Sequence, residues 1–182
     1  MDSNYRIIFS GSGGQGVITA SIVLAEAAVL HENLHAVQAQ SYGPEARGGA
    51  TRSDCIISNE PINYPKVINP HLLVCLTQES YNKFAGMVIP GGKIIIDPYY
   101  VNTPKKVTDA NQRGYPMYET VMDQIGNPIV HNICMLGVVL QLTEIVEAES
   151  LIKVFEQRMP AKFIDMNKKA LQLGLEMKHI DE

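Results

Sequence analysis

The chain has 182 residues, of which 46% are hydrophobic and 19% are charged, and its formal net charge at pH 7 is −4. This composition predicts one globular domain over residues 1–182, and it excludes a disordered chain and a broad basic surface for nucleic acid. No apolar run is long enough to span a bilayer, no signal peptide is visible and the three cysteines are scattered. We therefore expect a cytoplasmic protein that binds neither nucleic acid nor membranes.

A glycine-rich loop lies near the N-terminus, between an apolar segment at 6–10 and a periodic apolar stretch at 17–30 that predicts a helix. A strand, a glycine loop and a helix in this order are typical of a phosphate site, because backbone N–H groups at the helix N-terminus can face an anion. A purely structural turn is the alternative. The loop has G-x-G-x-x-G spacing, and its candidate binding residues are Gly11, Ser12, Gly13, Gly14, Gln15 and Gly16.

The second predicted strand, residues 36–40, ends without the acidic residue that a dinucleotide-binding domain uses to bind ribose hydroxyls. Glu32 precedes this strand and Glu45 follows it in the next loop, so neither takes that position. The lysine of a P-loop is also missing. NAD is therefore the second choice of ligand, and a stand-alone nucleotide-binding or NAD(P)-linked protein is the alternative function.

A second glycine-rich loop follows that strand. Because ligands of open α/β sheets collect at the carboxyl ends of the strands, we expect this loop to face the same crevice as the first. Arg47 can hold a phosphate with a bidentate fork, and Arg52 is a further candidate cation. The alternative is a surface ion pair between Glu45 and one of these arginines. The candidate residues of the loop are Ser41, Tyr42, Gly43, Pro44, Glu45, Arg47, Gly48 and Gly49.

The two motifs, GSGGQG and SYGPEARGG, resemble the gamma subunit of the 2-oxoacid:ferredoxin oxidoreductases, and the second is closer to the 2-oxoglutarate and branched-chain types than to the pyruvate type, with 2-oxoglutarate preferred. The resemblance continues through 53–67, 72–76, 90–97 and 132–140. It implies the oxidative decarboxylation of 2-oxoglutarate to succinyl-CoA by an enzyme of several subunits. It further implies that this chain contacts coenzyme A and closes over the active-site entrance, while thiamine diphosphate, Mg²⁺ and iron–sulfur clusters lie on thiamine-binding and ferredoxin-like partners.

The residues agree with a chain that is not catalytic alone. There is no G-D-G motif with a downstream Asn for a thiamine-bound magnesium ion, and no Ser, His and Asp set can be assembled from spacing. The three cysteines, Cys55, Cys75 and Cys134, are too widely spaced for a cluster or zinc signature, so we expect each to be buried and inert.

The remaining segments alternate between strands and helices, which predicts a doubly wound, largely parallel sheet with helices on both faces. Turn residues at 59–65 predict a short hairpin or a sheet edge after the strand at 55–57. Further strands are expected at 72–76 and 93–97, with a short one near 106–107. Helices are expected at 77–85, 120–125, 132–147, 151–157 and 163–178, with Ser150 as a cap.

Asp97 is expected to cap the turn at Pro98, and His131 and Asn132 to cap the helix that follows. That helix, 132–147, is apolar almost all round, which indicates burial in the core or at a subunit contact. With the loop at 41–52 we expect it to form a surface for partner subunits, so that the isolated chain forms a two-fold dimer.

Overall fold

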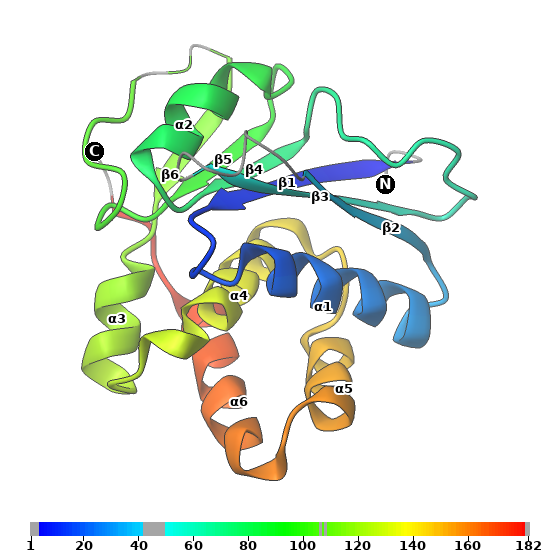
Figure 1. Ribbon diagram of the computed structural model, residues 1–182, viewed down its shortest axis with the longest axis vertical. Helices are drawn as coiled ribbons and strands as arrows, with labels where there is room; N and C mark the ends of the chain where they lie inside the picture. The colour runs from blue at the N-terminus through cyan, green and yellow to red at the C-terminus, as the bar shows by residue number, and fades with distance from the viewer. Residues whose placement is uncertain (1–3, 42–49, 106, 108, 181–182) are drawn as a thin grey trace.

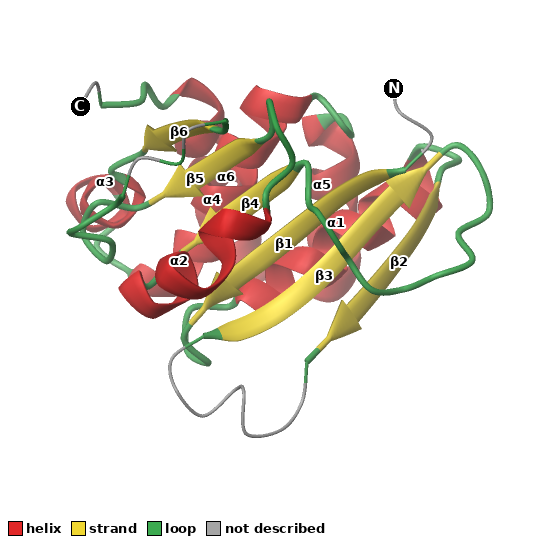
Figure 2. Cartoon of the chain, turned by 90° about the horizontal axis from the view of Figure 1, so that it is seen from above, coloured by secondary structure: helices red, strands yellow, loops and turns green. Residues whose placement is uncertain are grey.

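The computed structural model describes residues 4–41, 50–105, 107 and 109–180. Within these residues six strands form one sheet in the order β2-β3-β1-β4-β5-β6 (Figures 1 and 2). Every strand except β3 runs in the same direction. The predicted α/β fold with a largely parallel sheet is therefore confirmed. The strands are β1 (Tyr5–Gly11), β2 (His35–Gln40), β3 (Thr51–Ser58), β4 (Leu72–Cys75), β5 (Lys93–Ile96) and β6 (Asn111–Gly114).

Helices cover both faces of the sheet, as predicted (Figure 1). Successive residues of β1 face opposite sides, so that Ile7 and Phe9 enter one core and Ile8 the other. The first core lies against α1 (Val17–His31), α3 (Met117–Gln124), α4 (His131–Thr143), α5 (Ala148–Arg158) and α6 (Ala161–Glu176), and the second against α2 (Gln78–Phe84). No helix in the described residues has the length and apolar content needed to cross a membrane.

The strand predicted at 55–57 is longer than expected and lies inside the sheet, so the prediction of an edge is wrong. β3 pairs antiparallel with β2 on one side and with β1 on the other. Cys55 and Ile57 face the first core and Ile56 the second, which explains why the strand is covered on both faces. The antiparallel β2–β3 pair is the hairpin element of the fold, and the turn residues at 59–65 follow it without further strand structure.

The short strand predicted near 106–107 is misplaced. Lys106 lies outside the described residues, Val107 is irregular, and the strand is β6 at Asn111–Gly114. β6 is the last strand of the sheet, where it pairs with β5, and its Gly114 also forms an isolated antiparallel bridge with Ile180. Its sequence, NQRG, carries no apolar alternation, so its strand geometry comes from backbone pairing.

The prediction that α4 forms a surface for partner subunits is wrong, because this helix lies in the core of the chain. Every residue from 131 to 140 is buried. α6 crosses α4 closely, with Gly174 against Gly137, which removes side chains from the contact. The helix is also shorter than predicted, because Glu144 takes a left-handed conformation with φ of 49° and ends it. All-round apolarity therefore marks a core helix here.

The start of α5 is capped by a residue from α1's C-terminal end. Ser150, the predicted cap, lies inside α5, and its Oγ donates to Glu32 Oε1 at 2.5 Å. The backbone N–H of Glu147 donates to the same oxygen at 2.9 Å. Glu32 therefore holds two helices together, a role that its sequence position does not reveal.

These two hydrogen bonds hold the pKa of Glu32 below its usual range. Because the folded-state pKa is lowered, the contribution to stability is present above the unfolded-state pKa of about 4.3 and is lost as the pH falls through the folded-state pKa. We expect Glu32→Gln to lower the free energy of unfolding by about 1 kcal/mol or less at pH 7, and by less at pH 3. Urea unfolding at both pH values, with the exposed Glu60→Gln as control, measures this; equal losses at both pH values would contradict it.

Candidate functional site

The first glycine-rich loop lies at the carboxyl edge of the sheet, beside the described residues that flank the second. Gly11, at the end of β1, lies opposite Thr51, where β3 begins. The N–H of Ser41 donates to the carbonyl of Arg52 at 3.1 Å, so the described residues on either side of the second loop lie at this edge. The edge is also the point where the chain passes from the β2 side of β1 to β4, the usual place for a ligand in an open α/β sheet. The predicted site residues Tyr42, Gly43, Pro44, Glu45, Arg47, Gly48 and Gly49 lie outside the described residues.

Gln15 fixes the shape of the first loop. Its Oε1 accepts from the N–H of Ser12 at 2.7 Å, and its Nε2 donates to the carbonyl of Leu76, after β4, at 2.8 Å. Burial raises the pKa of Tyr100, and the nearby Gln15 side chain offsets this in part. Gln15 thus ties the loop to the segment after β4 at the sheet edge, so its candidate role includes holding the loop in place.

Two of the loop glycines are required by the fold. Gly16 is the N-cap of α1 and has a φ of 70°, in the left-handed region that favours glycine. A Cβ on Gly16 would also lie 2.6 Å from Asn132 Nδ2, and one on Gly11 would lie 2.6 Å from Gln15 Oε1. Both positions therefore need glycine for close packing, which agrees with the roles of these glycines in a strand-to-helix turn.

The other two glycines, Gly13 and Gly14, are exposed and are not required by the fold. A Cβ added to either would meet no atom within 4 Å, and neither has a left-handed φ. Next to them, the first N–H groups of α1 have no acceptor within the helix. Bare backbone at the open tip of the loop suits the approach of an anionic ligand, and no packing constraint explains it.

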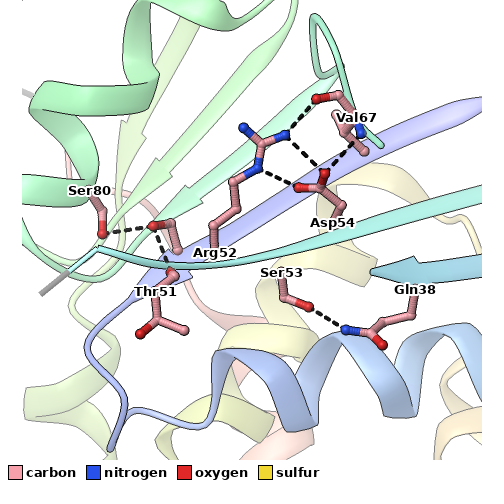
Figure 3. Close-up of polar contacts among 8 residues, drawn as sticks. Gln38, Thr51, Arg52, Ser53, Asp54, Val67 and Ser80 are labelled. Carbon is pink, nitrogen blue, oxygen red and sulfur yellow. Dashed lines mark hydrogen bonds and ion pairs between the residues drawn. The ribbon is translucent and has the colours of Figure 1, made fainter. Parts of the chain in front are cut away.

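Arg52 does not act as the predicted free cation. Its Nε donates to Asp54 Oδ1 at 2.6 Å, and its Nη2 donates to Asp54 Oδ2 at 3.0 Å and to the carbonyl of Val67 at 2.6 Å (Figure 3). Its guanidinium also lies over the ring of Phe84. Since residues two apart on a strand share a face, the Arg52 and Asp54 spacing was a signal for this pair. Arg52 therefore anchors the segment after β3.

A buried pair that the sequence analysis did not combine lies behind the loop. Asp97, at the end of β5, caps its turn as predicted, accepting from the N–H of Tyr99 at 3.1 Å. It also accepts from the N–H of Tyr118 at 2.8 Å, and its Oδ2 lies 2.9 Å from His131 Nε2. The ring centroid of Tyr100, which lies near Gln15, is 5.7 Å from that of His131. The pair therefore supports the tyrosine that contacts the loop.

The predicted capping role of His131 and Asn132 is not observed. The N-cap of α4 is Val130, with no side-chain cap. His131 instead pairs with Asp97, and Asn132 Nδ2 donates to the carbonyl of Gly16 at 3.3 Å. The start of α4 therefore holds the C-terminal end of the glycine loop.

The three cysteines are free and buried, and burial raises the pKa of both Cys55 and Cys134 to about 12. Cys55 and Cys75 lie on β3 and β4, which β1 separates, and they face different cores. Strands are about 4.8 Å apart, so these two thiols cannot bind one cluster. No group of three His, Cys, Asp or Glu side chains in the described part of the chain could hold a metal ion.

The dinucleotide alternative is not favoured by the strand order. In the dinucleotide-binding fold the second strand lies next to the first, where its terminal acid reaches the ribose. Here β3 separates β1 from β2, and Glu32 is engaged with α5.

A cavity of about 460 Å³ at the amino edge of the sheet lies away from both loops. Arg6, one of its lining residues, donates to the carbonyl of Asn69 at 3.1 Å. The arrangement of loops and glycines therefore favours the carboxyl edge as the site.

Comparisons with known proteins agree with the resemblance drawn from the two motifs. Residues 6–177 match the family model described as pyruvate ferredoxin/flavodoxin oxidoreductase. The chain is 44% identical to the 2-oxoglutarate synthase subunit KorC of Methanocaldococcus jannaschii over 94% of this chain and 92% of that protein. It is less similar to pyruvate synthase subunits of Methanothermobacter.

Two solved structures share the fold. The gamma subunit of a keto/oxoacid ferredoxin oxidoreductase from Geobacter sulfurreducens is 38% identical, with a TM-score of 0.85 over 94% of this chain and 96% of that chain. The 2-oxoglutarate:ferredoxin oxidoreductase of Magnetococcus marinus, with 2-oxoglutarate, coenzyme A and succinyl-CoA bound, is 19% identical, with a TM-score of 0.83 over 96% of this chain and 31% of that chain. The family match over most of the chain and the identity to KorC lead to one assignment: the chain belongs to the pyruvate ferredoxin/flavodoxin oxidoreductase family.

Proposed function

We propose that the chain is the gamma subunit of a 2-oxoglutarate:ferredoxin oxidoreductase, an enzyme that converts 2-oxoglutarate and coenzyme A to succinyl-CoA. The choice of 2-oxoglutarate is supported by the SYGPEARGG wording of the second loop and by the higher identity to KorC than to pyruvate synthase subunits. The partner subunits include a thiamine-binding chain and a ferredoxin-like chain. The clusters lie on those partners, since the buried cysteines of this chain do not fit a cluster, and thiamine diphosphate and Mg²⁺ are assigned to the thiamine-binding partner.

Within the enzyme, this chain binds the phosphates of coenzyme A at the carboxyl edge of the sheet. The observation that carries this proposal is the exposed backbone at Gly13 and Gly14, where glycine serves no packing need. The N-terminus of α1 adds N–H donors and a partial positive charge beside these residues. Arg47 supplies the charged fork, since Arg52 is engaged by Asp54. The remaining predicted residues of the second loop complete the site.

Arg47→Ala tests the proposal. Hydrogen bonds to charged groups contribute about 1.5–3 kcal/mol, so the apparent affinity of the assembled enzyme for coenzyme A should fall about tenfold to a hundredfold. The measurement is the rate of oxoacid-dependent acceptor reduction against coenzyme A concentration. Arg158→Ala is the matched control, because this exposed arginine pairs with Glu26 on the helical side of the molecule. Unchanged coenzyme A saturation in an intact Arg47→Ala complex would contradict the role of Arg47.

A further inference from the structure

A cavity of about 310 Å³ borders the glycine loop on the side facing α6. We name it the α6 pocket. Residues 14–16 of the loop form one wall, residues 128–130 form another, and side chains at the start of α6 close it. Its volume is in the range of small-molecule sites. Because the loop residues are shared, a ligand whose phosphates lie against Gly13 and Gly14 can place an adjoining group in this pocket.

The lining of the α6 pocket favours an uncharged group. None of the described residues that line it carries a charge, and the ammonium of Lys162, which lies 4.8 Å from the centroid of the Phe163 ring, is not part of the lining. Its apolar side chains include Ile129, Met159, Phe163 and Met166. Ile129 is 68% exposed. A flat, uncharged ring would cover Ile129 and find an aromatic surface in Phe163.

One polar group in the lining needs a hydrogen-bond donor. Asn132 is 8% exposed, and its Nδ2 is used by the carbonyl of Gly16. Its Oδ1 is buried and has no hydrogen-bond partner in the described part of the chain. A buried acceptor without a donor is unfavourable, and exchanging the amide atoms would place an oxygen against the Gly16 carbonyl. An exocyclic amino group of a nucleobase can donate to such an oxygen, and asparagine side chains characteristically bind that of adenine.

We propose that the α6 pocket binds the adenine base of an adenine nucleotide, with its amino group on Asn132 Oδ1 and its ring against Phe163. The flexible side chain of Met159 gives way as the base enters. This inference rests on the proposed function, because in coenzyme A the adenine belongs to the same nucleotide whose phosphates meet the glycine loop. The α6 pocket thereby adds recognition of the base to a site whose other contacts are with the phosphates.

The test uses the assembled enzyme and measures inhibition against coenzyme A by ADP, by IDP and by inorganic pyrophosphate. IDP carries the same phosphates as ADP but has a carbonyl in place of the amino group. We expect ADP to inhibit about tenfold more strongly than IDP, because IDP leaves Asn132 Oδ1 without a donor. Phe163→Ala should weaken inhibition by ADP about tenfold, since base stacking is lost. Inhibition by pyrophosphate should stay unchanged, since the loop is intact.

Two further variants keep the test decisive. Ile129→Ala removes an exposed side chain from the pocket wall at little risk to folding, and it should weaken inhibition by ADP several-fold. Gln172→Ala, an exposed position on α6 outside the pocket, should change nothing. Equal inhibition by ADP and IDP, or Phe163→Ala and Ile129→Ala enzymes with unchanged ADP inhibition, would overturn the adenine pocket while leaving the phosphate site standing. If Arg47→Ala also left coenzyme A saturation unchanged, the charged half of the proposed function would fail separately.

Discussion

Replacing Gly174 by alanine is expected to destabilise the chain by about 2 kcal/mol or more. A Cβ at this position would lie far inside contact distance of the carbonyl of Cys134 on α4, and 2.9 Å from the Cα of Gly137. These neighbours are backbone atoms, which yield only if the two helices move apart. Overpacking of this kind costs about 1–3 kcal/mol and occasionally more, against a gain of about 1 kcal/mol for alanine over glycine in a helix.

Urea unfolding followed by circular dichroism measures this loss. Gly137→Ala should behave similarly, because its Cβ would lie 2.8 Å from the Cα of Gly174. Gly86→Ala is the control, since an added Cβ there meets no atom within 4 Å, and its midpoint should stay near that of the wild type. A Gly174→Ala midpoint equal to that of the control would mean that α4 and α6 do not cross as described.

Gly13→Val is expected to leave folding intact and to abolish coenzyme A binding, whereas Gly174→Ala is expected to lower stability. Positive φ in this loop belongs to Gly16, so a branched side chain at Gly13 strains no left-handed residue and meets no neighbour. The side chain instead fills the space in front of the loop amides. Losing two hydrogen bonds to a charged phosphate reduces affinity by about a hundredfold or more.

The comparison for this variant is Gly86→Val, another exposed glycine with open space around it, which should leave coenzyme A saturation unchanged. Both variants should unfold within about 1 kcal/mol of the wild type. A Gly13→Val enzyme with ordinary coenzyme A saturation would show that the first loop is only a structural turn.

Local patterns predicted the parts of the fold that depend on neighbouring residues. The apolar run that became β4 and the glycine spacing before α1 gave the strand, the loop and the helix at the right places. β6 was misplaced to 106–107 because its polar sequence becomes a strand only by pairing with β5 at the edge. The insertion of β3 between β1 and β2 could not be predicted either, since it depends on pairing between segments far apart in sequence.

In the site, too, local features were predicted and contacts between distant residues were not. The glycine loop was identified from spacing, but its support comes from distant positions: Asn132 contacts Gly16 across 116 residues, and Asp97 pairs with His131 across 34. Arg52 was misassigned because charge alone does not distinguish a free cation from one held by Asp54. The α4 helix was assigned to a partner surface because apolarity does not say whether the covering helix belongs to the same chain.

Reconstitution of the enzyme tests the central claim most directly. The chain is mixed with the proposed thiamine-binding and ferredoxin-like partners, and reduction of a low-potential acceptor is followed with 2-oxoglutarate and coenzyme A. We expect no oxidation by the chain alone, little or none by the partners without it, and full activity that depends on both substrates when all are present. Full activity of the partners without this chain, or oxoacid oxidation by the chain by itself, would contradict its assignment as the coenzyme A-binding gamma subunit.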